Sequence, residues 1–333
     1  MSRRSTVKSF KFSLLIVLAA FIWGSAFVAQ SVGMDYIGPF MFNAFRFTIG
    51  GIVLIPVVII AGRAKERRHA GTTGSLSDLS GNDDQTATSV TAKSEIPFAS
   101  FSDTKRLIIC GIICGIILCT ASSFQQVGIQ YTTPGKSGFI TSLYVIMVPL
   151  FGLFTKEKPS VIMWLGALIS MIGMYLLCVS ESLSLNKGDI LTFSCAVCFA
   201  IHIIVIGRFA PYIDGIKLSC VQFFTAGVIS SVIAPIVEDL NVEMLFKAAV
   251  PILYAGVLSC GVAFTLQTIA QQKVNPVLCS LLFSLESVFS VLTSWIVLHE
   301  RLSAKEIIGC ILVFSAVVLV QIAPLLHPQR KIA

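Results

Sequence analysis

The sequence predicts an all-α polytopic membrane protein with ten transmembrane helices in two inverted five-helix repeats. Three observations predict it: an apolar composition, ten apolar runs of membrane-spanning length, and an internal repeat. Of the 333 residues, 55% are hydrophobic and only 12% are charged, whereas soluble domains carry about 25% charged residues. The net charge of +7 comes without a basic patch interleaved with aromatic residues, so no nucleic-acid partner is expected.

Windows of about 20 apolar residues indicate ten membrane spans. The first window follows the basic residues of segment 1–11, as in a signal peptide, but its apolar run is too long for one. It is therefore kept as a span of the mature chain, and segment 324–333 follows the last span. The predicted spans lie near 12–32, 40–61, 106–129, 135–154, 160–180, 189–208, 217–236, 248–271, 276–298 and 304–323.

Segment 63–104 interrupts this pattern. It is rich in Gly, Ser, Thr and Asp and lacks a helical or strand period, so it is predicted to be a disordered loop. Most of the 24 lysines and arginines fall in this loop and in other segments that share a side with the N-terminus. The positive-inside rule then places the loop and both termini in the cytoplasm. The opposite side holds only Lys136, Lys187, Lys247, Arg301 and Lys305.

The two halves of the chain, 12–180 and 181–323, can be laid on each other. FIWGSAF in the first span matches VCFAIHI in the sixth. Each half holds five spans, and because five is odd the halves cross the membrane in opposite senses, as in many secondary transporters. The matched positions include Arg46 with Gln222 at an offset of 176, Gln125 with Gln267 and Pro134 with Pro276 at 142, and Gly166 with Gly309 at 143.

The span 276–298 carries a carboxylate, Glu286, near its middle. A charge at that depth costs at least about 2.5–3.5 kcal/mol. The serines and threonines of this span share one half of the helix with Glu286, and Leu281, Leu285 and Val288 lie on the other half. This predicts one face toward lipid and one toward a polar interior. Helix packing would explain the serines and threonines, but it explains Glu286 poorly.

Glu286 is therefore the first candidate for a cavity residue. It could bind a cationic or amine group or carry a proton, and the alternative is a carboxyl that bonds helices together. In the other half, either Leu143 or Tyr144 stands at the matched position. The predicted cavity is therefore asymmetric.

Six further residues are candidates for substrate binding. Arg46 could bind a substrate carboxylate or pair with Glu286, or it could send its head to the membrane interface. His202 could relay protons or donate a hydrogen bond to a neighbouring helix. The matched amides of Gln125 and Gln267 need partners in lipid, so they line a cavity or join helices. The other two are Trp23 and Tyr144, which could form aromatic walls or serve as core or interfacial residues.

Several stretches also resemble one known family. WGSAF, the Arg of AFRF, LESVFSVLTSWIVLHERLS and the glycine-led GALISMIGMYLL and GCILVFSAVVLV resemble the EamA family of the drug/metabolite transporter (DMT) superfamily. The resemblance covers about residues 12–323 apart from the loop. It implies ten helices in two inverted repeats around a central cavity, and transport of amino acids or other small metabolites across the inner membrane. Two details stand out: Ser287 replaces a Pro that often follows the mid-span Glu in this family, and Ser303 with Glu306 has capping-box spacing.

These observations predict a secondary transporter of small polar metabolites such as amino acids or related amines, an exporter in the plasma (inner) membrane. Its mechanism would be alternating access around a midplane cavity. A membrane-embedded enzyme would need clustered His, Asp or Ser at membrane depth, and a channel would show non-saturating flux. No catalytic, metal or cofactor motif occurs in a suitable context. The expected partners are a small-molecule substrate and the lipid bilayer, with a proton or other coupling ion and a homodimer as further options.

Overall fold

In the computed structural model, every regular element of the described residues is helical. The structure describes residues 3–73, 98, 101–132, 134–154, 159–178, 186–239, 241–298 and 303–326. The first half contains α1 (Arg3–Met34), α2 (Pro39–Thr73), α3 (Asp103–Ile129), α4 (Pro134–Ser142), α5 (Tyr144–Phe154) and α6 (Val161–Cys178). The second half contains α7 (Lys187–Phe209), the 3₁₀ turn η2 (Ala210–Tyr212), α8 (Gly215–Val237), α9 (Val242–Lys247), α10 (Ala249–Leu253), the π-helix η3 (Tyr254–Phe264), α11 (Thr265–Ala270), α12 (Pro276–Phe283), α13 (Leu285–Leu298) and α14 (Ala304–Leu326).

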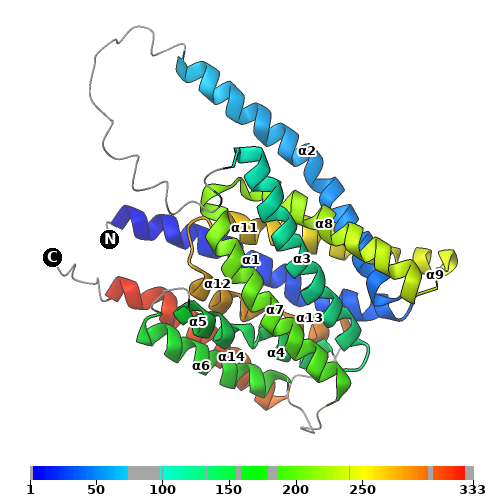
Figure 1. Cartoon of the computed structure of the whole chain (residues 1–333). Coiled ribbons are helices and arrows are strands. Elements are labelled where there is room, and N and C mark those ends of the chain that lie inside the picture. The colour runs from blue at the N-terminus through cyan, green and yellow to red at the C-terminus, as the bar shows by residue number, and fades with distance from the viewer. Residues whose placement is uncertain are drawn as a thin grey trace.

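Nine helical segments of the described residues are long and apolar enough to cross a membrane. They coincide with nine of the ten predicted spans. The predicted span 160–180 corresponds to α6, whose apolar part, Val161–Leu176, is shorter than the others. The first turns of α1 and the last turns of α14 lie at the same end of the bundle (Figure 1). The chain thus has the make-up of a multi-pass membrane protein.

Helix α2 is longer than predicted. It continues through Arg63 to Thr73, and this part extends beyond the rest of the bundle (Figure 1). The next helix begins at Asp103, with the Ser102 side chain accepting a bond from the Lys105 amide. The prediction of a loop over 63–104 is therefore wrong at both ends, because the first residues of that segment include good helix formers that prolong α2. Residues 74–97, 99 and 100 lie outside the described residues.

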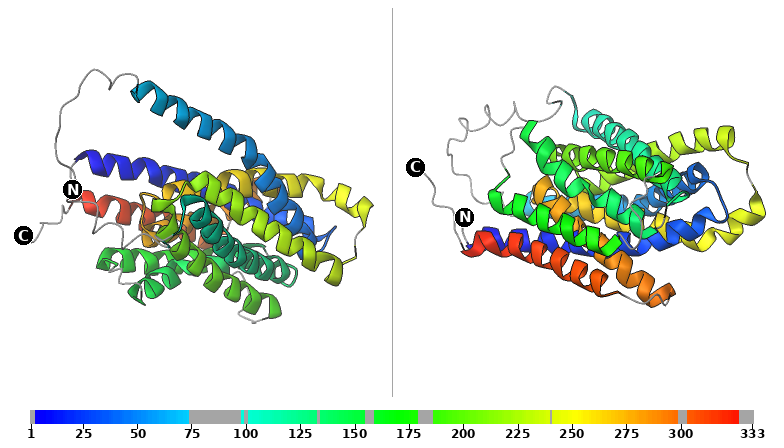
Figure 2. Two further views of the ribbon diagram at one scale, coloured as in Figure 1. Left: turned by 45° about the horizontal axis from the view of Figure 1, so that its top comes forward. Right: turned by 90° about the horizontal axis from the view of Figure 1, so that it is seen from below.

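The helices of the two halves pack against each other throughout the bundle (Figures 1 and 2). Helix α2 packs on α8 and α6 on α14, while α3 packs on α7 and α1 on both η3 and α13. At the centre of the α2–α8 contact, the rings of Phe47 and Phe223 stack with centroids 6.2 Å apart. The hydrophobic core is therefore built between the halves rather than within each of them.

The span that carries Glu286 is broken into α12 and α13 at Ser284. The Ser284 hydroxyl donates to the Leu281 carbonyl at 2.6 Å, and its amide is shared between the Ser280 and Leu281 carbonyls. A serine that bonds back into its own turn bends a helix, so the break needs no proline. The matched span is also interrupted, at Leu143 between α4 and α5, where the residue has no hydroxyl.

The expected lipid face of this span is absent over Pro276–Thr293, where 72% of the most apolar window is buried. Leu281, Leu285 and Val288, which were assigned to that face, are all buried. Helices α1, α4, α5 and α6 all contact α12 or α13. The prediction of one lipid face was wrong because a helix's own periodicity does not reveal how many neighbours surround it.

Gly24 of the WGSAF stretch allows α1 to approach α13 closely. A Cβ atom at Gly24 would lie 2.5 Å from the Glu286 carbonyl oxygen and 2.7 Å from the Phe289 Cβ atom. Only a residue without a side chain fits there unless the helices move apart. This contact holds the Glu286 turn against the helix that carries Trp23.

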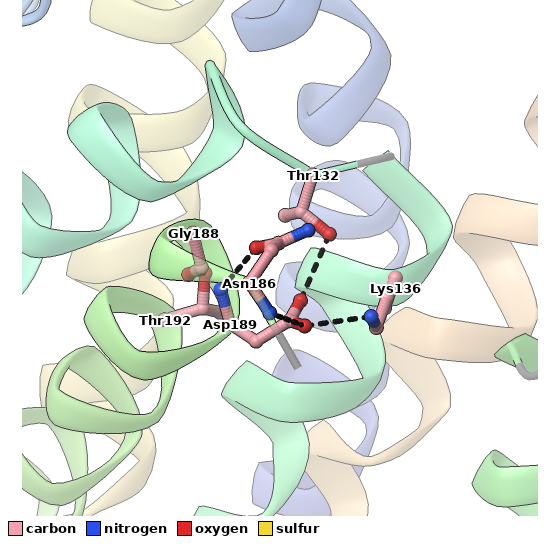
Figure 3. Close-up of polar contacts among 6 residues, drawn as sticks. All are labelled: Thr132, Lys136, Asn186, Gly188, Asp189 and Thr192. Atoms are coloured by element: carbon pink, nitrogen blue, oxygen red, sulfur yellow. Dashed lines mark hydrogen bonds and ion pairs between the residues drawn. The ribbon is translucent and has the colours of Figure 1, made fainter. Parts of the chain in front are cut away.

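Polar groups fasten α4 to the start of α7 (Figure 3). The Asp189 carboxylate accepts bonds from the Asn186 amide at 2.9 Å, the Thr132 hydroxyl at 3.1 Å and the Lys136 ammonium at 2.6 Å. Asn186 and Asp189 form a capping box. The predicted capping box of Ser303 and Glu306 is likewise present at the start of α14.

Candidate functional site

One cavity between the halves is lined by all seven residues that the sequence singled out as candidates. The space that no atom fills is about 530 Å³, including its opening to the outside. The seven are Trp23 and Arg46 from α1 and α2, Gln125 from α3, Tyr144 from α5, His202 from α7, Gln267 from α11 and Glu286 from α13.

The Glu286 carboxylate lies at one part of this cavity and joins the two broken spans. Its Oε1 atom accepts a bond from the Tyr144 hydroxyl at 2.8 Å and another from the Ser142 hydroxyl at 3.0 Å. The Ser142 and Ser287 hydroxyls are also 3.0 Å apart. Only 4% of Glu286 is exposed. A carboxylate has about four lone-pair sites, so capacity remains for a ligand.

Arg46 provides the other charged group among the described residues that line the cavity. Its guanidinium donates to the Gln30 side-chain oxygen at 2.9 Å and lies 4.7 Å from the centre of the Phe47 ring. The residue is 4% exposed, and its Nε atom has no partner. The head therefore stays inside the bundle and does not reach the interface. No ion pair joins it to Glu286, since the ion pairs among described residues are Arg106–Asp103, Lys136–Asp189 and Lys247–Glu243.

His202 bonds to a neighbouring helix, which is one of the two roles that the sequence suggested for it. Its Nε2 atom is 3.1 Å from the Gln222 side-chain oxygen on α8, and its Nδ1 atom has no partner. The residue is fully buried. One ring nitrogen is thus free to bond a ligand in the cavity.

The two matched glutamines differ in their bonding. Gln267 donates to the Gln271 side-chain oxygen at 3.0 Å, and Gln271 donates to the Ile203 carbonyl at 2.8 Å. The side-chain oxygen of Gln267 has no partner. Gln267 thus combines both roles predicted for it, because it lines the cavity and takes part in a bonded chain between helices. Gln125 lines the cavity from α3.

Aromatic rings form the apolar wall. The Trp23 ring lies 4.6 Å from the Phe264 ring and 4.9 Å from the Phe283 ring, centre to centre. Its indole nitrogen donates to the Ser259 carbonyl at 3.4 Å. Tyr144 offers its hydroxyl to Glu286 and is 4% exposed. The cavity therefore combines a broad apolar wall with a few placed polar groups, which is typical of small-molecule sites.

The sequence reasoning missed several lining residues. Gln30 is the most informative, because Trp23, Phe27 and Gln30 follow one another at helical spacing and so share a face of α1. That spacing could have identified it. The others are Phe27, Ser122, Thr141, Phe199, Ile203, Ser259, Phe264 and Phe283, and their residue types give little signal within an apolar span.

Comparison with known families decides the identity. The profile of the EamA-like transporter family matches residues 11–77, 88–179 and 186–322. The chain belongs to the EamA-like transporter family. The resemblance seen in the WGSAF, AFRF and ERLS stretches is thereby confirmed, and it is consistent with the DMT superfamily.

Similar proteins agree with this assignment. An uncharacterized transporter of Archaeoglobus fulgidus is 28% identical over 322 residues, covering 95% of this chain and 87% of its own. The uncharacterized transporter YoaV of Bacillus subtilis is 21% identical over 311 residues, covering 91% of this chain and 94% of its own. The family and both relatives are thus described as transporters.

A solved crystal structure shares the fold. It superposes with a TM-score of 0.70 at 18% sequence identity and covers 96% of this chain and 99% of its own. At that identity, the likeness concerns the fold alone.

Proposed function

We propose that this chain is a secondary transporter that exports small polar metabolites, such as amino acids or related amines, by alternating access around the cavity. The observation that carries the proposal is the placement of Arg46 and Glu286 in the lining of one buried cavity without an ion pair between them. Two buried, unpaired charges of opposite sign are costly in a membrane bundle. Their cost is offset when a substrate that carries both charges binds between them.

The proposal includes ten crossings in two inverted repeats, with α6 as the fifth crossing. Support comes from matched residues that meet each other, as expected for residues near a two-fold axis. Phe47 stacks on Phe223, at an offset of 176, and Tyr144 bonds to Glu286, at an offset of 142. Each pair joins corresponding spans of the two halves. In an inverted repeat, such corresponding spans cross the membrane in opposite directions.

Glycine contacts give a second line of support for the repeats. A Cβ atom on Gly51 would meet the Phe224 ring at 3.0 Å, and one on Gly227 would meet the Thr48 hydroxyl at 2.9 Å. Gly51 matches Gly227, and Thr48 matches Phe224, at the same offset of 176. The two contacts are therefore images of each other, which a two-fold relation between α2 and α8 explains.

The proposed location is the plasma (inner) membrane with both termini in the cytoplasm. The distribution of lysine and arginine supports this orientation. The shared end of α1 and α14 in Figures 1 and 2 is compatible with an even number of crossings. Export is the direction that the family resemblance suggests.

A flux assay tests the proposal. The purified protein is first screened by thermal shift against amino acids and amines, because a ligand that binds the folded state raises its melting temperature. The compound with the largest shift is then used in proteoliposomes. Glu286→Gln should lower saturable flux at least about tenfold, since a charge-assisted bond contributes about 1.5–3 kcal/mol, and should change its dependence on pH.

The matched control is Glu243→Gln, which removes an exposed carboxylate on α9 that pairs with Lys247. It should leave flux unchanged. Equal flux for folded Glu286→Gln and wild-type protein at every pH would remove Glu286 from the mechanism.

A further inference from the structure

Two buried hydroxyls join helices at the end of the bundle where α7 ends and α8 begins. The Ser219 hydroxyl donates to the Thr268 hydroxyl at 3.1 Å, and the Thr268 hydroxyl donates to the Phe264 carbonyl at 2.8 Å. Both residues are 0% exposed. Ser219 stands near the start of α8 and Thr268 near the end of α11. The pair therefore fastens these two helices at the residue next to Gln267, which lines the cavity.

The matched positions in the first half are Asn43, at the offset of 176, and Gln126, at the offset of 142. Asn43 stands near the start of α2 and Gln126 near the end of α3, and these helices contact each other as α8 and α11 do. The pair lies at the opposite end of the bundle, where α1 ends and α2 begins. It is the image of Ser219 and Thr268 under the proposed two-fold relation.

The bonding of this second pair is very different. Asn43 and Gln126 are both 0% exposed. Neither polar atom of the Asn43 side chain has a partner, and the Gln126 side-chain oxygen has none either. The Gln126 nitrogen makes one weak contact, 3.7 Å from the Met34 sulfur. Buried amides without partners are rare and costly in any interior, so this arrangement requires an explanation.

Alternating access provides one. In a transporter built from inverted repeats, each half takes up in one state the arrangement that the other half has in the opposite state. The bonded pair and the unbonded pair then show the two arrangements that each matched pair alternates between. We propose that Ser219 with Thr268 and Asn43 with Gln126 are two gate pairs, and that Asn43 bonds to Gln126 in the state in which Ser219 and Thr268 separate. This inference rests on the proposed function.

Hydrogen–deuterium exchange of the purified protein in lipid nanodiscs tests the gate pairs without any ligand. Two matched stretches report on the two ends of the bundle: residues 30–42, around the α1–α2 junction, and residues 206–218, around the α7–α8 junction. The variants are Ser219→Ala, which removes one gate bond, and Asn43→Ala, which prevents the other. Ser230→Ala is the matched control, because it is the same substitution at another fully buried position of α8.

Ser219→Ala should speed exchange over 206–218 about two- to tenfold and slow it over 30–42, because one hydrogen bond shifts a two-state equilibrium by about that factor. Asn43→Ala should do the reverse. The double variant should return toward the wild-type pattern, and Ser219→Thr, which keeps the hydroxyl, should resemble wild type. Ser230→Ala should not change the exchange rates of the two stretches in opposite directions.

Changes of the same sign at both ends would overturn the inference, because they would indicate local loosening rather than exchange between two states. Unchanged exchange in folded Ser219→Ala and Asn43→Ala would overturn it as well. Flux of the same variants is measured separately. Opposite exchange shifts without flux of any tested compound would support the gate pairs while counting against the proposed substrate class alone.

Discussion

The broken helices α4–α5 and α12–α13 share a backbone course but differ in chemistry. One breaks at Leu143 and the other at Ser284, and each break lies within two residues of the side chain that meets its counterpart. That side chain is Tyr144 in the first half and Glu286 in the second, and the two bond at 2.8 Å. The break therefore belongs to the scaffold, whereas the charge belongs to the site.

Helices α2 and α8 show the same kind of difference, but here the charged residue belongs to the first half. Arg46 of α2 matches Gln222 of α8, and both are buried beside the cavity or its histidine. Each half thus supplies one charge where the other half supplies a neutral hydrogen-bonding group. Under the proposed two-fold relation, matched positions thus carry an asymmetric pair of charges, which would suit the proposed substrate with two different ends.

Making the halves alike at Arg46 should give the largest effect. Arg46→Gln copies the residue found at the matched position, Gln222, and removes the guanidinium that bonds Gln30. Flux should fall about tenfold or more, as expected for the loss of a charge-assisted bond of about 1.5–3 kcal/mol. Arg46→Lys should restore only part of it, because an ammonium lacks the planar donor fork. Full flux in Arg46→Gln would show that the cavity does not need two charges.

A second change tests a place where the halves differ in packing. Gly24 matches Ala200 in α7, where the alanine side chain fits in a fully buried position. Gly24→Ala should nevertheless destabilise the protein by about 1–3 kcal/mol, because the new Cβ atom would meet the backbone of Glu286. A lower melting temperature in detergent measures this. The reciprocal Ala200→Gly should cost less, about 0.5–1 kcal/mol, and equal losses would argue against the close approach.

The bond between the matched residues can be removed on its own. Tyr144→Phe deletes the hydroxyl that bonds Glu286 and keeps the ring, so flux should change about two- to tenfold. Tyr175→Phe is the control, since Tyr175 is 41% exposed and lies away from the cavity lining. If both variants behave alike, the Tyr144–Glu286 bond has no part in transport.

The smallest effect is expected where the halves agree. Ser303 caps α14, and its match Ser160 accepts a bond from the Met163 amide. Ser303→Ala and Ser160→Ala should each destabilise by about 0.5–2 kcal/mol, with flux per folded molecule unchanged. A loss of flux in either variant at full stability would contradict a purely structural role.

Much of the cavity lining could be predicted, because polar side chains in an apolar span are costly to expose to lipid. Arg46, His202 and Glu286 could not face lipid without a large cost, so they were expected at the cavity, in bonds between helices or, for Arg46, at the membrane interface. Matching the halves also identified Tyr144 as a candidate counterpart of Glu286. What a single span cannot show is its surroundings. The burial of Leu281 and Leu285 depends on helices that are distant in the sequence.

Other features depend on local bonds that no pattern of residue types predicts. At the break in α12–α13, the Ser284 hydroxyl bonds the Leu281 carbonyl. The pairing of Arg46 with Gln30 depends on the approach of α1 and α2. Each of these needs coordinates rather than periodicity.

The π-helix η3 marks a difference in length between the two halves. Gly115 of α3 approaches the Gln222 carbonyl of α8, and Gly256 of η3 approaches the matched Arg46 carbonyl of α2. From these glycines to the matched residues Gln125 and Gln267, the second half has one residue more. A π-helical stretch absorbs such an added residue within a helix. An ancestral duplication followed by a single-residue insertion would leave this signature, and the inserted position should be sought between Gly256 and Gln267 in related chains.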